Sequence, residues 1–322
     1  MKINQSLISK FKSYSNYIKD IEEYYGEYWK KIVEDFDADL NENGWVNLGK
    51  QNFYPIRITA DNIELDIQNF ININSIKLKN DPHNNILLKN TYSFKFLKEK
   101  KIINNNFQKI IEIGPGCGVL SSLILNEKEK KFFIVDIPKM IKISGSFLMT
   151  LFPNYRFVFP NEIKDKNDFI NGDVIFLLPS QINLIQDDYF DVAINNHSFQ
   201  EMDYKEIENY LYLIKRSLKK GSYFLCSNRL RKETKFLQYN WKILNNFKIL
   251  HLDKNKDQKK YNNLITYIDL LSKKGNSDEK NFKIGFLKVF FINNSFHLSE
   301  RFFWIKRDFK KIIRKLINLK ME

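Results

Sequence analysis

The sequence predicts an α/β fold in which a mostly parallel sheet is covered by helices on both faces. From residue 107 onward, short apolar runs alternate with helical patterns, which is typical of strand–helix–strand units. These runs are apolar at nearly every position, as expected of parallel strands that are buried on both faces. A glycine-rich turn joins the first run to the first helix. Together these three observations favour a doubly wound sheet.

Residues 107–125 form the centre of this predicted fold. Residues 109–113 predict a buried strand, Gly114-Pro-Gly-Cys-Gly118 predicts a turn, and residues 119–125 predict a helix. Glycine allows backbone conformations that a Cβ forbids, and it lets a ligand approach bare main chain. The helix start adds free N–H groups, which suit an electron-rich ligand group. We therefore predict a nucleotide-type pocket at this turn.

Two acidic residues narrow the choice of ligand. The glycine spacing differs from the G-x-G-x-x-G dinucleotide fingerprint, and the turn lacks the Lys-Ser/Thr ending of a phosphate-binding loop. Glu112 lies two residues before the first glycine, where a carboxylate would repel a phosphate and attract a cation. Asp136 closes the next apolar strand, residues 132–136, and follows Gly118 by 18 residues.

The order acid-x-Gly-x-Gly-x-Gly, followed by Asp136, resembles the class I S-adenosylmethionine-dependent methyltransferases. The resemblance implies a Rossmann-like, seven-stranded sheet and S-adenosyl-L-methionine as cofactor. It further implies that Asp136 accepts hydrogen bonds from the two ribose hydroxyls, and that residues after the third strand, 173–178, lie along the adenine. The cofactor-binding residues expected on this basis are Glu112, Gly114, Pro115, Gly116, Gly118, Asp136, Ile137, Leu178, Ser180, Gln181 and Asn195.

A polar run, Asn195-Asn-His-Ser-Phe-Gln-Glu-Met202, follows the predicted fourth strand, residues 191–194. Ligands of open α/β sheets bind at such strand ends. With Leu-Pro-Ser-Gln before it and Ser-Asn-Arg after the next strand, the run resembles bacterial sugar O-methyltransferases encoded among glycan and antibiotic-sugar genes. The resemblance implies transfer of a methyl group to a hydroxyl of a sugar or glycan precursor.

Methyl transfer to a hydroxyl needs a base, and His197 is the candidate catalytic residue because its ordinary pKa lies near neutrality. Glu201, four residues on, is the candidate to orient the imidazole or to bind a sugar hydroxyl. A second interpretation makes His197 a structural residue at a strand end.

Other acceptors and roles stay open at this stage. The formal charge of +14 invites a nucleic-acid partner, but only 8 of the 52 basic residues are Arg, the side chain that contacts phosphates and bases bidentately. RNA is therefore disfavoured as an acceptor. Another small-molecule acceptor, or a non-catalytic scaffold that binds S-adenosylmethionine, are the remaining alternatives.

The cysteines and histidines do not indicate a metal site. Only Cys117 and Cys226 are present, without metal-ligand spacing, and the four histidines are scattered. Cys117 lies inside the glycine turn, where we interpret it as a packing residue.

The regions flanking residues 107–272 are predicted to be extensions. Residues 1–106 are expected to be mainly helical, with one long helix over residues 6–36 and another over 91–103, and the resemblance implies that this extension covers the site and selects the acceptor. Within the central region, Gly221 is expected to end a helix begun at Asp203, and residues 233–245 to form a helix. The last strand is either 264–271 or 287–292.

Residues 273–322 form the predicted C-terminal extension, in which the pattern over 299–320 predicts a basic amphipathic helix. Two interpretations of this helix stay open: packing on its own domain or on a second copy of the chain, and contact with an anionic membrane surface. No apolar stretch approaches the ~20 residues that span a bilayer, and no signal-peptide core is found. We expect a cytoplasmic protein, with the inner membrane face as a peripheral location under the second interpretation.

Overall fold

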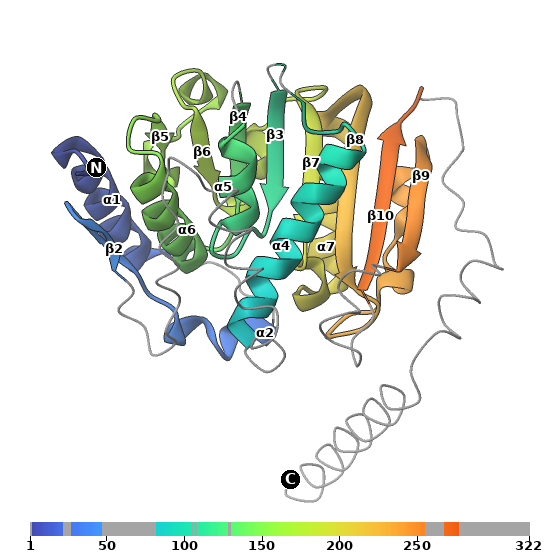
Figure 1. The fold of residues 1–322 in the computed structure, drawn as a ribbon, viewed down its shortest axis with the longest axis horizontal. Helices are drawn as coiled ribbons and strands as arrows, with labels where there is room; N and C mark the ends of the chain where they lie inside the picture. Colours follow the sequence, from blue (N-terminus) through green and yellow to red (C-terminus); the bar gives the residue numbers. More distant parts are fainter. Residues whose placement is uncertain are drawn as a thin grey trace, which may run out of the picture.

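The computed structural model describes residues 2–21, 27–46, 82–104, 106, 108–127, 130–254 and 267–276. An eight-stranded sheet runs through the molecule (Figure 1). Seven strands were predicted, and the two-residue edge strand β5 brings the number to eight. In spatial order the strands are β5 (Phe157–Val158), β6 (Val174–Leu177), β4 (Lys130–Val135), β3 (Gln108–Ile113), β7 (Phe190–Asn196), β8 (Leu218–Arg229), β10 (Tyr267–Lys274) and β9 (Phe247–Lys254).

The strand directions confirm the predicted mostly parallel sheet. Neighbours from β5 to β8 pair in parallel, whereas β10 is antiparallel to both β8 and β9. From β3 the chain moves outward through β4 and β6, and it then returns to β7 on the other side of β3. The strand order therefore reverses between β3 and β7, and a ligand site is expected at the carboxyl ends of these two strands.

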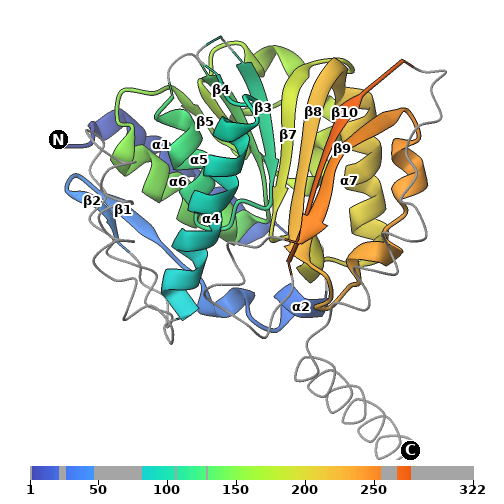
Figure 2. The ribbon, with the colours of Figure 1, turned by 45° about the vertical axis from the view of Figure 1, so that its right-hand side comes forward.

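Helices cover both faces of the sheet (Figure 2). Neighbouring residues of β3 point to opposite faces, because side chains alternate along a strand. Ile110 packs in the core with α4 (Pro82–Glu99), α5 (Val119–Leu125) and α6 (Pro138–Leu151), whereas Ile111 packs in the core with α7 (Tyr204–Ser217). Both residues are fully buried, as the continuous apolar pattern predicts.

The single long helix predicted over residues 6–36 is wrong. The segment forms α1 (Gln5–Tyr17), a 3-10 turn (Ile18–Asp20), the short helix α2 (Glu27–Lys30) and a second turn (Val33–Asp35). A straight helix of this length would extend roughly 46 Å. The chain instead divides its apolar stripe between two places, because Tyr14 stacks on Phe159 while Trp29 packs on Phe36 near the site. Tertiary packing therefore breaks the segment into shorter elements, although its apolar residues keep the spacing of one helix.

The hairpin of β1 (Asp39–Asn41) and β2 (Gly44–Val46) follows these helices. It lies against α6, where the Trp45 N–H donates to Thr150 Oγ1 at 2.9 Å. The second helix predicted in this region, 91–103, is present as α4, which begins earlier and ends at Glu99. The chain before residue 107 thus contains strands as well as helices.

Two predictions after residue 217 are wrong. Gly221 does not cap a helix, because α7 ends at Ser217 and Gly221 lies inside β8 with φ +82°. The β7–β8 register shifts there, and glycine supplies the backbone conformation that such an irregularity needs. The helix predicted over 233–245 is replaced by two 3-10 turns, Phe236–Gln238 and Trp241–Leu244, which bury Trp241 against Phe236.

The remaining C-terminal predictions are only partly covered by the structure. Within the part of the chain that the structure describes, the last strand is β10, Tyr267–Lys274, which overlaps the first of the two alternatives, 264–271. Residues 287–292 and the basic helix 299–320 lie outside the described residues. Among the described residues, no helix combines the length and apolar character needed to cross a membrane.

Candidate functional site

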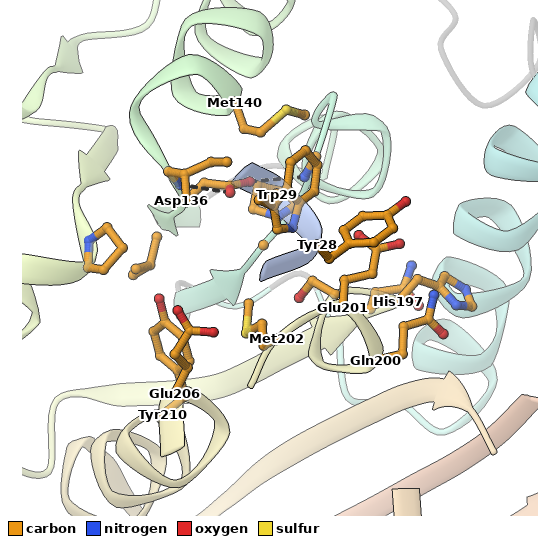
Figure 3. Close-up of a pocket in the computed structure, with 18 of the residues that line it drawn as sticks. Tyr28, Trp29, Asp136, Met140, His197, Gln200, Glu201, Met202, Glu206 and Tyr210 are labelled. Atoms are coloured by element: carbon orange, nitrogen blue, oxygen red, sulfur yellow. Dashed lines mark hydrogen bonds between the residues drawn. The ribbon is translucent and has the colours of Figure 1, made fainter. Parts of the chain in front are cut away.

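A pocket of about 490 Å³ lies at the carboxyl ends of β3, β4 and β7. Its volume falls within the range of small-molecule sites. Figure 3 shows Asp136 and Met140 toward one part of the pocket and His197 and Gln200 toward another, with Tyr28 and Trp29 between them. We call the first group the glycine-turn end: Gly114, Pro115, Gly116, Cys117, Asp136, Ile137, Met140, Pro179 and Ile182. We call the second the polar end: Lys89, Asn90, Asn196, His197, Gln200, Glu201 and Arg229.

The glycine turn has the backbone that its sequence predicts. Gly114, Gly116 and Gly118 all have positive φ, at +67°, +62° and +81°. A Cβ on Gly114 would lie 2.3 Å from Ser198 Oγ, so this position excludes any side chain. A Cβ on Gly116 would meet nothing nearer than Met140 Cε at 4.0 Å, and it would therefore project toward the pocket. Gly116 leaves bare main chain open to a ligand.

Asp136 is fixed at the end of β4 by main-chain hydrogen bonds. Its carboxylate accepts from the Gly116 N–H at 3.2 Å and from the Ile137 N–H at 2.8 Å. Burial raises the pKa of Asp136 to about 7, although these two N–H groups act to lower it. A carboxylate with acceptor capacity therefore faces the pocket beside bare main chain.

Glu112 lies beneath the glycine turn and does not line the pocket. Its side chain is 1% exposed, and Oε2 accepts a hydrogen bond from Ser121 at 2.6 Å, while Oε1 has no hydrogen-bond partner. Burial raises the pKa of Glu112 to about 8, and the nearby Asp136 adds to this increase. A buried carboxyl group with one unsatisfied oxygen is costly for stability, which suggests a functional reason for its presence.

The residues expected along the adenine do not line the pocket themselves, although two of their neighbours do. Pro179 and Ile182 line the pocket, whereas Leu178, Ser180 and Gln181 are absent from its wall. The Gln181 amide accepts from the Leu178 N–H and donates to the Pro160 carbonyl, which holds the 3-10 turn Pro179–Leu184. The sequence indicates the correct turn, but the turn itself decides which of its side chains face inward.

Asn195 and Gly118 are also absent from the pocket wall. Asn195 is fully buried and donates to the Ile113 carbonyl at 3.0 Å, while its oxygen accepts from Asn228 at 2.7 Å. It therefore ties the ends of β3, β7 and β8 together, which fixes the edge of the pocket. Gly118 instead packs near Ser144 of α6.

His197 occupies a left-handed backbone position, with φ +68°, at the end of β7. Its main-chain N–H donates to the Ser227 carbonyl at 2.7 Å. Its ring packs edge-on against Tyr267, with 4.9 Å between the ring centroids. Burial lowers the pKa of His197 well below its ordinary value, and Lys89, Arg229 and Lys232 lower it further. The expectation of a pKa near neutrality is therefore wrong, and the imidazole is neutral at pH 7.

Glu201 forms an ion pair with Lys232. Both side chains are largely buried, at 17% and 13% exposed, and the Lys232 ammonium also lies over the Tyr28 ring at 4.1 Å. Glu201 is thus oriented by a cation from the segment after β8, and α2 covers the pair with an aromatic ring.

Several pocket residues are not among the predicted site residues. Tyr28 and Trp29 come from α2, Lys89 and Asn90 from α4, and Arg229 from the end of β8. Arg229 follows a predicted strand end, so the sequence could have placed it at the same edge of the sheet as the other site residues. The other four come from segments far from the sheet in sequence, and no local pattern marks them.

Cys117 lines the pocket within the glycine turn. Burial raises the pKa of its thiol to about 11, so the thiol stays protonated at neutral pH. This agrees with a packing residue.

No protein-family model matches the chain, and no curated protein matches its sequence. Solved structures do resemble it. A Burkholderia thailandensis 1,6-didemethyltoxoflavin-N1-methyltransferase with bound S-adenosylhomocysteine is 11% identical over 74% of this chain and 100% of its own, with a TM-score of 0.40. The [4+2]-cyclase SpnF is 13% identical over 57% and 80%, with a TM-score of 0.41. An arsenic(III) S-adenosylmethionine methyltransferase from Chlamydomonas reinhardtii is 11% identical over 55% and 65%, with a TM-score of 0.35.

Proposed function

We propose that the protein is an S-adenosylmethionine-dependent methyltransferase. The observation that carries the proposal is the glycine-turn end, where the bare main chain of Gly116 and the Asp136 carboxylate face one pocket. Asp136 offers acceptor oxygens for ribose hydroxyls, and Gly116 leaves the space that a side chain would fill. The unsatisfied Oε1 of Glu112 lies beneath the same turn. The bare main chain of Gly116 and the Asp136 carboxylate fit a nucleoside cofactor, whereas Glu112, which is largely protonated at neutral pH, would act only through the turn above it.

In this proposal the glycine-turn end holds the cofactor. Asp136 would bind the ribose, and the apolar side chains of Ile137, Met140 and Ile182 would contact the base. When bound, S-adenosylmethionine supplies an electrophilic methyl group on its sulfonium. Trp29 packs against the apolar cluster that contains Met140, so α2 would exclude water from this end.

We further propose that the methyl acceptor is a hydroxyl of a sugar or glycan precursor. The pocket combines aromatic walls, Tyr28, Trp29 and Tyr210, with amide and carboxylate groups at its polar end. Aromatic faces suit the C–H faces of a sugar ring, whereas Asn196, Gln200 and Glu201 suit its hydroxyls. Because Tyr28 and Trp29 belong to α2, the N-terminal segment would take part in choosing the acceptor.

His197 is the proposed proton acceptor for that hydroxyl. A neutral imidazole can take a proton, so the low pKa of His197 leaves it in the form that a base requires. The same low pKa makes it a weak base, and orientation of the hydroxyl would then provide much of the acceleration. Glu201, held by Lys232, would bind a sugar hydroxyl instead of orienting the imidazole.

A transfer assay with isotopically labelled S-adenosylmethionine tests this function. The purified chain is incubated with a panel of nucleotide sugars, oligosaccharides and RNA, and labelled product is counted. We expect label on a sugar, and His197→Ala should reduce turnover about 10²-fold while cofactor affinity is retained. Label on RNA alone would contradict the sugar proposal. Cofactor binding without transfer to any member of the panel would favour a non-catalytic scaffold.

A further inference from the structure

Two cations line the polar end without a carboxylate partner among the described residues. Lys89 reaches the pocket from α4, and Arg229 reaches it from the end of β8. The nearby Lys232 differs, because Glu201 pairs with it. Lys89 and Arg229 therefore leave an excess of positive charge at this end of the pocket.

Both cations lie against one buried phenol. The Lys89 ammonium is 4.8 Å from the centroid of the Tyr267 ring, and the Arg229 guanidinium carbon is 5.6 Å from the same centroid. Arg229 Nε also donates to the Tyr267 hydroxyl at 3.0 Å, and Tyr267 is 2% exposed. The ring brings the cations to one place, but a phenol that accepts hydrogen bonds does not balance two charges. Both cations are half-buried at the pocket wall, so an anion that joined them would compensate charges that are already partly removed from water.

The position of Arg229 is fixed from its main chain. Its N–H donates to Gln200 Oε1 at 2.7 Å, and Gln200 is 3% exposed at the pocket wall. The guanidinium extends from this fixed strand end, and its Nε hydrogen bond to Tyr267 restrains the side chain, so less side-chain entropy is lost on binding. Arg presents a planar fork of donors that matches phosphate and carboxylate oxygens.

We propose that the methyl acceptor carries an anionic group, a phosphate or a carboxylate, that binds to Lys89 and Arg229 at the polar end. The proposal rests on the methyltransferase function and names the class of its acceptor. His197 packs on the same Tyr267 ring, so the anionic group would lie near the proposed base. For a sugar acceptor, this means either a nucleotide-linked sugar or a sugar acid.

Anion binding would also act on His197. Lys89 and Arg229 help to lower the pKa of this imidazole, and a bound anion would offset their effect. The pKa of His197 would then rise toward its ordinary value only when the acceptor is present. The acceptor would thereby strengthen the base that it needs.

Titration of the full chain with small anions tests the proposal. Protein saturated with S-adenosylhomocysteine is titrated with inorganic pyrophosphate, with glucuronate and with neutral glucose. We expect at least one anion to bind, more weakly as salt is raised, and glucose to bind less well. Lys89→Gln and Arg229→Gln should each weaken anion binding about tenfold or more, whereas Lys242→Gln, an exposed lysine on the turn Trp241–Leu244, should not. The pyrophosphate and glucuronate arms distinguish a phosphate from a carboxylate.

Each other outcome has a definite meaning. If neither anion binds to the wild-type protein, or if Lys89→Gln binds anions as tightly as wild type, the proposal is overturned. If Arg229→Gln fails to fold, the comparison of anion affinity between the wild-type protein and Lys89→Gln still tests the proposal. If S-adenosylhomocysteine itself does not bind, the proposed function fails instead. Binding of S-adenosylhomocysteine without binding of anions leaves the methyltransferase proposal standing and removes only this inference.

Discussion

The two ends of the pocket are assembled in different ways. The glycine-turn end comes mostly from consecutive strand ends, with Gly114 and Gly116 after β3 and Asp136 after β4. The polar end gathers Lys89 from α4, His197 from the end of β7 and Arg229 from the end of β8. The glycine-turn end therefore follows from local sequence patterns, whereas the polar end depends on how segments distant in sequence pack together. The α2 helix spans both, because Trp29 packs near Met140 while Tyr28 covers Lys232.

This contrast predicts where substitutions act. Changes at the glycine-turn end should alter the backbone or the affinity for a nucleoside, whereas changes at the polar end should alter the acceptor and leave cofactor affinity intact. Four comparisons test this division, and they follow in order of decreasing effect.

The largest effect is expected from Gly114→Ala. The new Cβ would lie 2.3 Å from Ser198 Oγ in a left-handed position, so strain and overpacking should together lower the free energy of unfolding by about 2–5 kcal/mol. Gly221→Ala is the matched control, because its φ is also positive but its Cβ would meet nothing nearer than Lys273 Cε at 3.9 Å. Urea unfolding should show a loss of about 1–2 kcal/mol for the control. Equal losses in both variants would mean that the contact with Ser198 is unimportant.

The second effect is an opposition between stability and binding as pH changes. The folded-state pKa values of Glu112 and Asp136 are raised to about 8 and about 7, so the folded chain binds more protons than the unfolded chain. Their contribution to stability is complete below the ordinary pKa of these carboxyls and is lost as pH rises through about 7 and about 8. The unfolding free energy of the ligand-free protein should therefore fall between pH 6 and pH 8, and Glu112→Gln should flatten this slope.

Cofactor binding should change in the opposite direction, because Asp136 must be ionised to accept two hydrogen bonds. Affinity for S-adenosylhomocysteine should fall roughly fivefold to tenfold between pH 8 and pH 6, the range in which this carboxylate takes up a proton. Calorimetry at the two pH values measures it. Affinity that does not change over this range would show that the ionisation of Asp136 is not linked to binding.

The sequence predicted the positions of the glycine turn and of Asp136, but it did not predict most residues of the polar end. Gly114, Gly116 and Asp136 follow strands whose apolar runs are unmistakable, and parallel strands bring their carboxyl ends to one edge. The sheet itself was predicted for the same reason. By contrast, the break after Tyr17 could not be predicted, because the apolar stripe continues through it and only packing on Phe159 and Met140 divides it.

The low pKa of His197 could not be predicted from the sequence either. Its place at the end of β7 followed from the sequence, but its surroundings did not. Lys89 precedes residue 91, where its helix was predicted to begin, and Lys232 comes from a segment next to a wrongly predicted helix. Local sequence patterns cannot predict an electrostatic environment that three separate segments form together.

The third effect concerns Trp29, which should act on the glycine-turn end despite its distance in sequence. Trp29→Ala removes a ring that packs with Phe36 and lines the pocket, so affinity for S-adenosylhomocysteine should fall about threefold to tenfold, or about 1 kcal/mol. Tyr28→Leu serves as the control and should leave this affinity unchanged. A larger loss in the control would place the cofactor at the other end of the pocket.

The smallest effect is the coupling between Tyr28 and Lys232. The ammonium lies 4.1 Å from the ring centroid, and the Lys232 side chain is 13% exposed, so the interaction should contribute about 0.5–1 kcal/mol to stability. A double-mutant cycle with Tyr28→Leu and Lys232→Met measures it from urea unfolding. Strictly additive losses would mean that α2 is not held at the polar end by this contact.

Calorimetric titration with S-adenosylhomocysteine shows whether the glycine-turn end binds this cofactor. The wild-type protein should bind it in the micromolar range and should prefer it to NAD. Asp136→Asn keeps the shape of the side chain but removes its charge, so it should lose roughly tenfold to a hundredfold in affinity, as expected when charge-assisted hydrogen bonds are weakened. Equal affinity in the wild type and in Asp136→Asn, or a preference for NAD, would contradict the assignment of the glycine-turn end to this cofactor.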